Sequence, residues 1–164
     1  ANIAVQAALT GHRVLSTVHT NDAAGAITRF VDMGIEPFLV ASVILVSFAQ
    51  RLVRRVCPNC SEPYRPSAEA LSFWGLTPPE DARFLRGRGC FHCQDTGYRG
   101  RIGIYEVLLI DDAIRDMIVK NRASHAITRA AHEAGHLRLL REDAFEKVVR
   151  GITSMEEAAS AVMV

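Results

Sequence analysis

The segments Cys57-Pro58-Asn59-Cys60 and Cys90-Phe91-His92-Cys93 hold all four cysteines of this 164-residue chain. The Cys-x-x-Cys spacing bends the backbone into a tight knuckle in which both thiolates can bind one ion. Two knuckles, separated by 29 residues, can present four sulfur atoms in the tetrahedron that Zn²⁺ accepts. The sequence therefore predicts a zinc site with Cys57, Cys60, Cys90 and Cys93 as ligands. Because four thiolates leave no open coordination position, we expect a structural and not a catalytic metal.

These cysteines have three alternatives to a zinc site: a redox dithiol, an iron site and a disulfide. A redox dithiol needs its first thiolate at a helix N-terminus, whereas Pro63 and Pro66 follow the first pair and disfavour a helix there. Iron is an alternative metal. A disulfide is a further alternative, although the low cysteine content and the lack of a signal peptide favour a reducing compartment. His92 could replace a cysteine as ligand, but its place inside the knuckle predicts that it points outward.

Composition indicates a globular protein of one ordinary or two small domains, with 49% hydrophobic and 23% charged residues. Residues 51–101 carry nine arginines against five acidic residues. A zinc ion bound by four thiolates carries a charge of about −2, so the metal site would balance part of this excess. The longest apolar run, residues 38–49, is shorter than the roughly 20 residues that span a bilayer, and it predicts a buried helix.

The first part of the chain has the pattern of an α/β fold. A helix over residues 2–9 ends at Gly11, a β-branched strand is predicted over 13–18, and a helix over 23–33 follows. Ligands of parallel sheets bind at the carboxyl ends of strands. A polar group lies at that end, comprising Ser16, Thr17, His19, Thr20 and Asn21. This group is either a ligand-facing cluster or a plain helix cap beside a surface histidine.

The remaining elements are predicted by caps and periodicity. A short helix starts near Ser67 and ends at Gly75, and a strand over 101–109 is expected to pair with the strand before Cys57. Four short amphipathic helices follow, the first capped by Asp111 and Asp112, the second by Ser124, the third over 141–150, and the last with a capping box at 154–157. Such helices indicate a packing or docking subdomain.

Four landmarks, in one order, resemble a known family. They are T-G-H-R-V-L-S-T-V-H-T-N-D-A at 10–23, Q-R-L-V-R-R at 50–55, the two cysteine pairs, and G-Y-R-G-R-I-G-I-Y-E at 97–106. Together they cover essentially the whole chain. The chain resembles the GspE/PilB-like ATPases, hexameric motors that power type II secretion and type IV pilus assembly.

The resemblance implies a fold and a set of site residues. Residues 1–56 would be the C-terminal part of a RecA-like P-loop ATPase domain, 57–95 a tetracysteine zinc insert, and 96–164 a strand with a C-terminal helical subdomain. His12 and His19 would be the histidines of the family's His box, with His19 the better candidate to approach the γ-phosphate and Thr17 as its neighbour. Independently of the resemblance, three arginines before the first cysteine pair, Arg51, Arg54 and Arg55, are candidate phosphate or subunit-interface contacts, and solvated charge beside the zinc site is the alternative.

The resemblance also implies cofactors, partners and a location. The family uses ATP and Mg²⁺, but no G-x-x-x-x-G-K-[ST] phosphate loop occurs in these 164 residues. We expect the sequence to begin just after the Walker B motif, and this chain alone to be inactive. The intact protein is expected to be a cytoplasmic homohexamer of a bacterium, docked on an inner-membrane platform protein, peripheral to the membrane and without direct nucleic-acid contact. The landmarks do not separate secretion, pilus assembly and DNA uptake.

Two other classes stay open as alternatives. A zinc ribbon that binds nucleic acid would place aromatic residues among lysines and arginines on exposed strands, yet the segment between the cysteine pairs has no lysine. His132-Glu133-Ala134-Gly135-His136 matches the H-E-x-x-H motif of zinc proteases, which requires an unbroken helix through the second histidine. Because Gly135 is predicted to end this helix, we expect a chance match.

Overall fold

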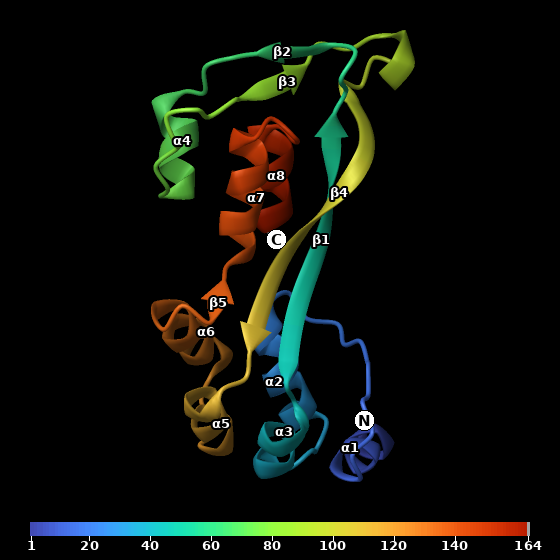
Figure 1. Cartoon of the computed structure of the whole chain (residues 1–164), viewed down its shortest axis with the longest axis vertical. Helices are drawn as coiled ribbons and strands as arrows, with labels where there is room; N and C mark the ends of the chain where they lie inside the picture. The colour runs from blue at the N-terminus through green and yellow to red at the C-terminus, as the bar shows by residue number, and fades with distance from the viewer. Residues whose placement is uncertain (164) are drawn as a thin grey trace. The chain divides into compact units, whose positions relative to one another are not determined.

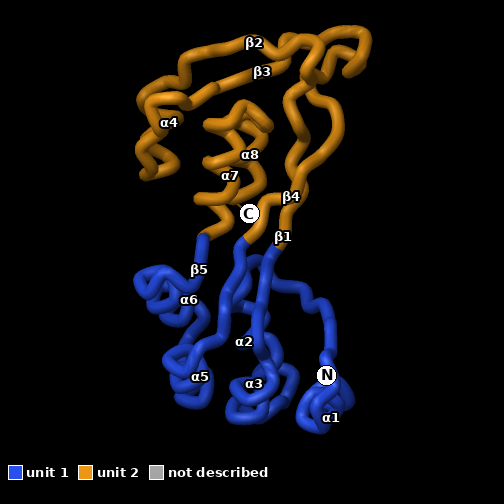
Figure 2. The backbone as a smooth tube through the Cα atoms, in the orientation of Figure 1, with its two compact units in different colours: residues 1–49, 106–138 blue, residues 50–105, 139–164 orange. Residues whose placement is uncertain are grey.

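The computed structural model describes residues 1–163 as two compact units (Figure 2). Unit 1 contains Ala1–Ala49 and Glu106–Arg138, and unit 2 contains Gln50–Tyr105 and Leu139–Val164. Two long strands, β1 (Val46–Val56) and β4 (Tyr98–Leu109), have residues in both units. They are hydrogen-bonded neighbours in a sheet of order β1-β4-β5 and run in opposite directions (Figure 1). This pairing confirms the strand partner predicted for 101–109.

Unit 1 is built mainly from helices that pack on one another. Its further elements are α1 (Asn2–Leu9), α2 (Ala23–Asp32), α3 (Pro37–Val43), α5 (Asp112–Val119), α6 (Ser124–Glu133) and β5 (Leu137–Arg138). Strand β5 pairs antiparallel with β4. Apolar side chains from these elements form the core, including Ile27, Val40, Leu108, Ile114 and Ile127.

Acidic side chains cap two helices of unit 1, and the cap at Asp111 is the predicted one. The Asp22 carboxylate accepts the Gly25 amide at 2.5 Å, and the Asp111 carboxylate accepts the Ile114 amide at 2.8 Å. Ser124, predicted as a cap, is instead the first residue of α6, and no side-chain capping bond forms at this end. Assignments of helix ends differ by a residue or two, so the element itself is confirmed.

Unit 2 holds the segment between the cysteine pairs and the last two helices. Its short elements are β2 (Ser61–Pro63), α4 (Ala68–Trp74), β3 (Leu85–Gly87) and the 3₁₀ turn Phe91–Cys93, followed by α7 (Leu140–Val149) and α8 (Met155–Val162). Strands β2 and β3 pair antiparallel. Trp74 is 1% exposed and packs against Phe145, with ring centroids 5.5 Å apart. The insert therefore has one large apolar anchor in the core of unit 2.

Helix α8 is attached to the strands through a charged pair. Ser154 caps α8 as predicted, since its hydroxyl accepts the Glu157 amide at 3.2 Å. The Glu157 carboxylate turns to β1, where it accepts the Arg54 amide at 2.9 Å and the guanidinium at 2.9 and 2.5 Å. The guanidinium lies 4.2 Å from the centre of the Tyr98 ring on β4. One glutamate thus joins the last helix to the sheet.

Two predicted elements are wrong. Residues 13–18 form no strand, and Leu15 is 96% exposed. A buried strand needs hydrogen-bonded neighbours, and no strand among residues 1–163 pairs with this segment. The apolar run 38–49 is not one helix, because α3 ends at Val43 and β1 begins at Val46. Its β-branched residues favour a strand, and an unbroken apolar run cannot distinguish the two structures.

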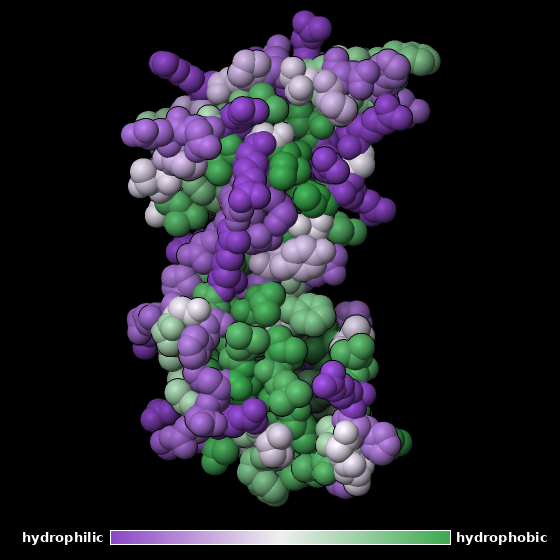
Figure 3. Space-filling view, in the orientation of Figure 1, coloured by the Kyte–Doolittle hydropathy of each residue, from purple (hydrophilic) through white to green (hydrophobic). Residues whose placement is uncertain are grey.

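Unit 1 exposes many apolar side chains. Figure 3 shows apolar residues over much of the visible face of this unit. Phe48 on β1 is 63% exposed, Leu109 on β4 is 55% exposed, and Val46 and Val107 are also exposed.

Candidate metal centre

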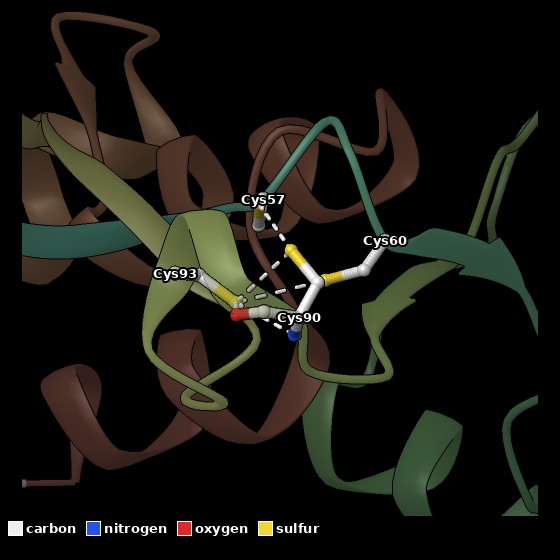
Figure 4. A group of neighbouring side chains, drawn as sticks. All are labelled: Cys57, Cys60, Cys90 and Cys93. Atoms are coloured by element: carbon white, nitrogen blue, oxygen red, sulfur yellow. Dashed lines mark hydrogen bonds between the residues drawn. The ribbon is translucent and has the colours of Figure 1, made fainter.

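The four cysteines converge on one point at the ends of β1 and β4 (Figure 4). Their sulfur atoms all lie within 4.8 Å of one another. The separations are 3.9 Å for Cys57 to Cys90, 3.8 Å for Cys60 to Cys93, and 3.7 Å for Cys90 to Cys93. Sulfur atoms at the corners of a tetrahedron with Zn–S bonds of about 2.3 Å would be about 3.8 Å apart. The geometry therefore fits a Zn²⁺ ion bound by four thiolates.

Backbone hydrogen bonds shape the two knuckles. The Cys60 amide donates to the Cys57 carbonyl at 3.3 Å, and the Cys93 amide donates to the Cys90 carbonyl at 3.1 Å. The Cys57 amide donates to the Gly97 carbonyl at 2.9 Å, which links the first knuckle to the second. Gly97 has φ +78°, and a Cβ there would lie 2.6 Å from the Gly87 carbonyl oxygen. Only glycine fits this approach of two backbones.

The thiols of the cluster differ in how readily they ionise. Burial opposes ionisation of Cys93, but hydrogen bonds from the Gly97 and Cys90 amides lower its pKa to about 7. The Gly97 amide donates to the Cys93 sulfur at 3.3 Å, and the Cys90 amide donates to it at 3.2 Å. Burial raises the pKa of Cys60 to about 12. A cation among the sulfur atoms would favour the thiolate form of Cys60.

The structure contradicts two alternatives for these residues. All four cysteines are free, and their sulfur separations are far longer than the bond of about 2.05 Å in a disulfide. His92 is exposed, as predicted, and lies outside the cluster. Its neighbour Phe91 is 92% exposed.

The H-E-x-x-H segment does not form a metal site. Helix α6 ends at Glu133, and Gly135 has φ +76°, so His132 and His136 do not share a helical face. The His136 Nδ1 atom lies 2.6 Å from the Asp111 carboxylate. The Ile114 amide, together with His136, lowers the pKa of Asp111. Within the described part of the chain, no second group of histidine, cysteine or acidic side chains is placed to hold a metal ion.

The histidine segment predicted from sequence lies in unit 1, between α1 and α2. His12, Thr17 and His19 are all exposed. The His12 Nδ1 atom lies 3.1 Å from the Thr10 hydroxyl and 3.3 Å from the Ala7 carbonyl, so this ring is held at the end of α1. Arg51 lies on β1 in unit 2 and is half-buried. The roles of these four residues stay predictions.

Sequence reasoning missed the residues that hold the start of α2. Glu106 on β4 is 4% exposed, and its carboxylate accepts the Ala23 amide at 2.9 Å. The Ser47 hydroxyl on β1 donates to the Ala23 carbonyl at 2.7 Å. An acidic residue inside an apolar strand was the available signal, because a buried carboxylate needs hydrogen-bonding partners.

The fold is similar to those of two solved structures. It matches the crystal structure of the pilus retraction motor PilT with bound ADP over 98% of this chain and 35% of that chain, with a TM-score of 0.62 and 20% identity. It also matches the X-ray structure of the Legionella pneumophila ATPase DotB over 97% of this chain and 34% of that chain, with a TM-score of 0.58 and 21% identity. The mixed α/β fold is therefore that of these ATPases.

The family is identified by sequence. The family model described as "Type II/IV secretion system protein" matches residues 1–160, and the chain belongs to this family. It is 50% identical over 157 residues to type II secretion system protein E of Pseudomonas aeruginosa, covering 96% of this chain and 31% of that protein. It is 48% identical over 157 residues to type II secretion system ATPase E of Vibrio cholerae, with the same coverage.

A pilus protein is similar to nearly the same degree. The chain is 46% identical over 159 residues to the type IV pilus assembly ATPase PilB of Thermus thermophilus, covering 96% of this chain and 18% of that protein. The chain thus spans less than a third of the length of these relatives. No helix in residues 1–163 is both long and apolar enough to cross a membrane.

Proposed function

We propose that this chain is part of an ATP-hydrolysing motor that drives type II protein secretion or type IV pilus assembly. The observation that carries the proposal is the identity of 46–50% over 96% of the chain to relatives of both kinds, two of which are named as ATPases. The intact protein would bind ATP and Mg²⁺ and work as a cytoplasmic homohexamer on an inner-membrane platform protein. Residues 1–56 would contribute to the nucleotide domain, 57–95 the zinc insert, and 96–164 the helical subdomain.

The metal in this proposal is a structural Zn²⁺ held by Cys57, Cys60, Cys90 and Cys93. Three sulfur separations of 3.7–3.9 Å support zinc, and a thiolate tetrahedron leaves no position for a substrate. The ion supplies folding free energy by cross-linking the two knuckles. Elemental analysis should find one zinc per chain, and Cys57→Ser or Cys90→Ser should release it. Full zinc content in either variant would contradict the ligand assignment.

His19 is proposed to act at the nucleotide. A neutral imidazole can donate one hydrogen bond to a phosphate oxygen, and a donor placed on developing charge is worth about 10²–10³ in kcat. Thr17 and Arg51 are proposed as secondary phosphate contacts. The 164-residue chain itself is expected to show no hydrolysis.

The test is steady-state ATP hydrolysis by the full-length hexamer. His19→Ala should lower kcat about 100-fold, with hexamer assembly unchanged by light scattering. His125→Ala is the matched control, because His125 is also an exposed histidine of unit 1 but lies on α6. Equal turnover in the two variants would remove the role given to His19.

A further inference from the structure

Two carboxylates meet the first turn of α2, the helix that follows the His-box segment. A helix start leaves its first amides without intrahelical acceptors. Asp22 satisfies the Gly25 amide from within the segment. The Ala23 amide is satisfied by Glu106, which is 83 positions away in sequence and lies on β4.

Burial of the Glu106 carboxylate costs free energy. It is 4% exposed, and a buried carboxylate is tolerated only when hydrogen bonds and favourable charge compensate its lost hydration. The positive end of the α2 dipole and the 2.9 Å bond from Ala23 provide such compensation. A local side chain would have capped the helix at a lower cost, so this arrangement fixes a position in addition to stabilising a helix.

Ser47 completes the arrangement from the other long strand. Its hydroxyl donates to the Ala23 carbonyl at 2.7 Å, while Glu106 holds the Ala23 amide. Ala23, at 1% exposure, is therefore held through both of its backbone polar groups, one from β1 and one from β4. The start of α2 is therefore held against both long strands by hydrogen bonds.

The restraint on Ala23 extends to His19. Only three residues separate them, and the Thr20 hydroxyl donates to the Asp22 carbonyl at 3.1 Å, which narrows the conformations of the intervening backbone. In addition, Glu106 and Asp22 occupy the anion-binding end of α2. These two carboxylates occupy the place of an anion at the start of α2. A phosphate bound near this helix start would therefore be contacted by side chains such as His19 and not by the α2 amides.

We propose that Glu106, assisted by Ser47, is a positioning residue for ATP hydrolysis that fixes the start of α2 and thereby the direction of His19. This inference rests on the proposed function. Displacing a reacting group by about 1 Å can cost about 10²-fold in rate. Loss of the carboxylate should therefore lower kcat with little change in ATP binding.

The experiment uses the full-length hexamer and compares Glu106→Ala with Asp143→Ala. Asp143 is the matched control, because it is also buried, at 9% exposure, and its carboxylate accepts the Tyr105 amide at 2.8 Å one residue before Glu106. Both variants should melt at similarly lowered temperatures. Glu106→Ala should lower kcat about 10- to 100-fold with KM for ATP within about twofold, whereas Asp143→Ala should lower kcat less than about threefold.

Two conservative variants keep the test decisive if the alanine variant does not fold. Glu106→Gln retains an oxygen that can accept the Ala23 amide, so it should keep kcat within about threefold. Ser47→Ala should lower kcat about threefold with KM unchanged. Wild-type kcat in Ser47→Ala, or a loss of about tenfold or more in Glu106→Gln, would overturn the proposal.

A double variant connects the effect to His19. If Glu106 acts through His19, then adding Glu106→Ala to His19→Ala should lower kcat no further. Fully multiplicative losses would overturn the positioning role. If His19→Ala loses most of its kcat while Glu106→Ala keeps normal kcat, only the positioning role of Glu106 is overturned. If His19→Ala keeps normal kcat, the role of His19 is overturned, and the positioning role of Glu106 is overturned with it.

Discussion

Removing the metal should lower the melting temperature of unit 2 far below that of the zinc-loaded protein. The ion closes a loop of 29 residues between Cys60 and Cys90. By the chain-entropy relation for a cross-link, releasing a loop of about 30 residues costs about 3.6 kcal/mol at 25 °C. A change of 1 kcal/mol shifts Tm by about 4–8 °C in a domain of about 60–100 residues, which corresponds to unit 2. We therefore expect a loss of about 15–30 °C.

The single tryptophan reports on this transition. Trp74 lies within the closed loop, on α4, and is 1% exposed in the core of unit 2. Its fluorescence should be followed during thermal melting of the reduced 164-residue chain, with and without a chelator, and metal content should be measured on the same samples. His92→Ala is the control, because His92 lies in the knuckle but outside the cluster. A Tm difference below about 5 °C in verified metal-free protein would refute the reasoning.

Three further predictions concern other contacts. Because Arg54 lowers the pKa of Glu157, this carboxylate stabilises the fold above the ordinary glutamate pKa of about 4.3, and its contribution is lost as pH falls through the lowered value. Glu157→Gln should therefore lower the free energy of unfolding by about 1–3 kcal/mol at pH 7, and this loss should shrink as pH falls below the ordinary glutamate pKa, measured by urea denaturation at each pH. Gly97→Ala should weaken zinc binding and cost more than about 2 kcal/mol, whereas Gly34→Ala, at φ +84° but with open space around it, should cost about 1–2 kcal/mol and leave zinc affinity unchanged. His132→Ala should retain one zinc per chain by elemental analysis, since α6 ends before the second histidine of its motif.

The features that could be predicted from sequence are those set by local chemistry. The Cys-x-x-Cys spacing led to the four-sulfur cluster, and Asp111 and Ser154 led to two helix starts. In each case the decisive contacts lie within four residues or follow from the ligand requirements of one ion. The resemblance to the secretion ATPases, carried by four landmarks, is confirmed by the family match over residues 1–160.

The features that could not be predicted depend on distant partners. Residues 13–18 have the composition of a buried strand, but a strand forms only beside another strand. The run 38–49 changes from helix to strand at residues 44–45 because β4, about 60 residues later, pairs with it. In the sequence, Glu106 is one acidic residue within an apolar strand, and its role is clear only from its hydrogen bond with the Ala23 amide. No local pattern identifies such pairs.

The discontinuous make-up of unit 2 has a consequence for its biosynthesis. The chain leaves this unit after Tyr105 and returns to it only at Leu139. All four zinc ligands have been translated by residue 93, whereas Phe145, which covers Trp74, is translated some fifty residues later. On the ribosome the metal can therefore be acquired before the apolar cover exists. The concentration of zinc available during translation, more than that available after folding, would then determine how much of the nascent chain escapes aggregation and degradation.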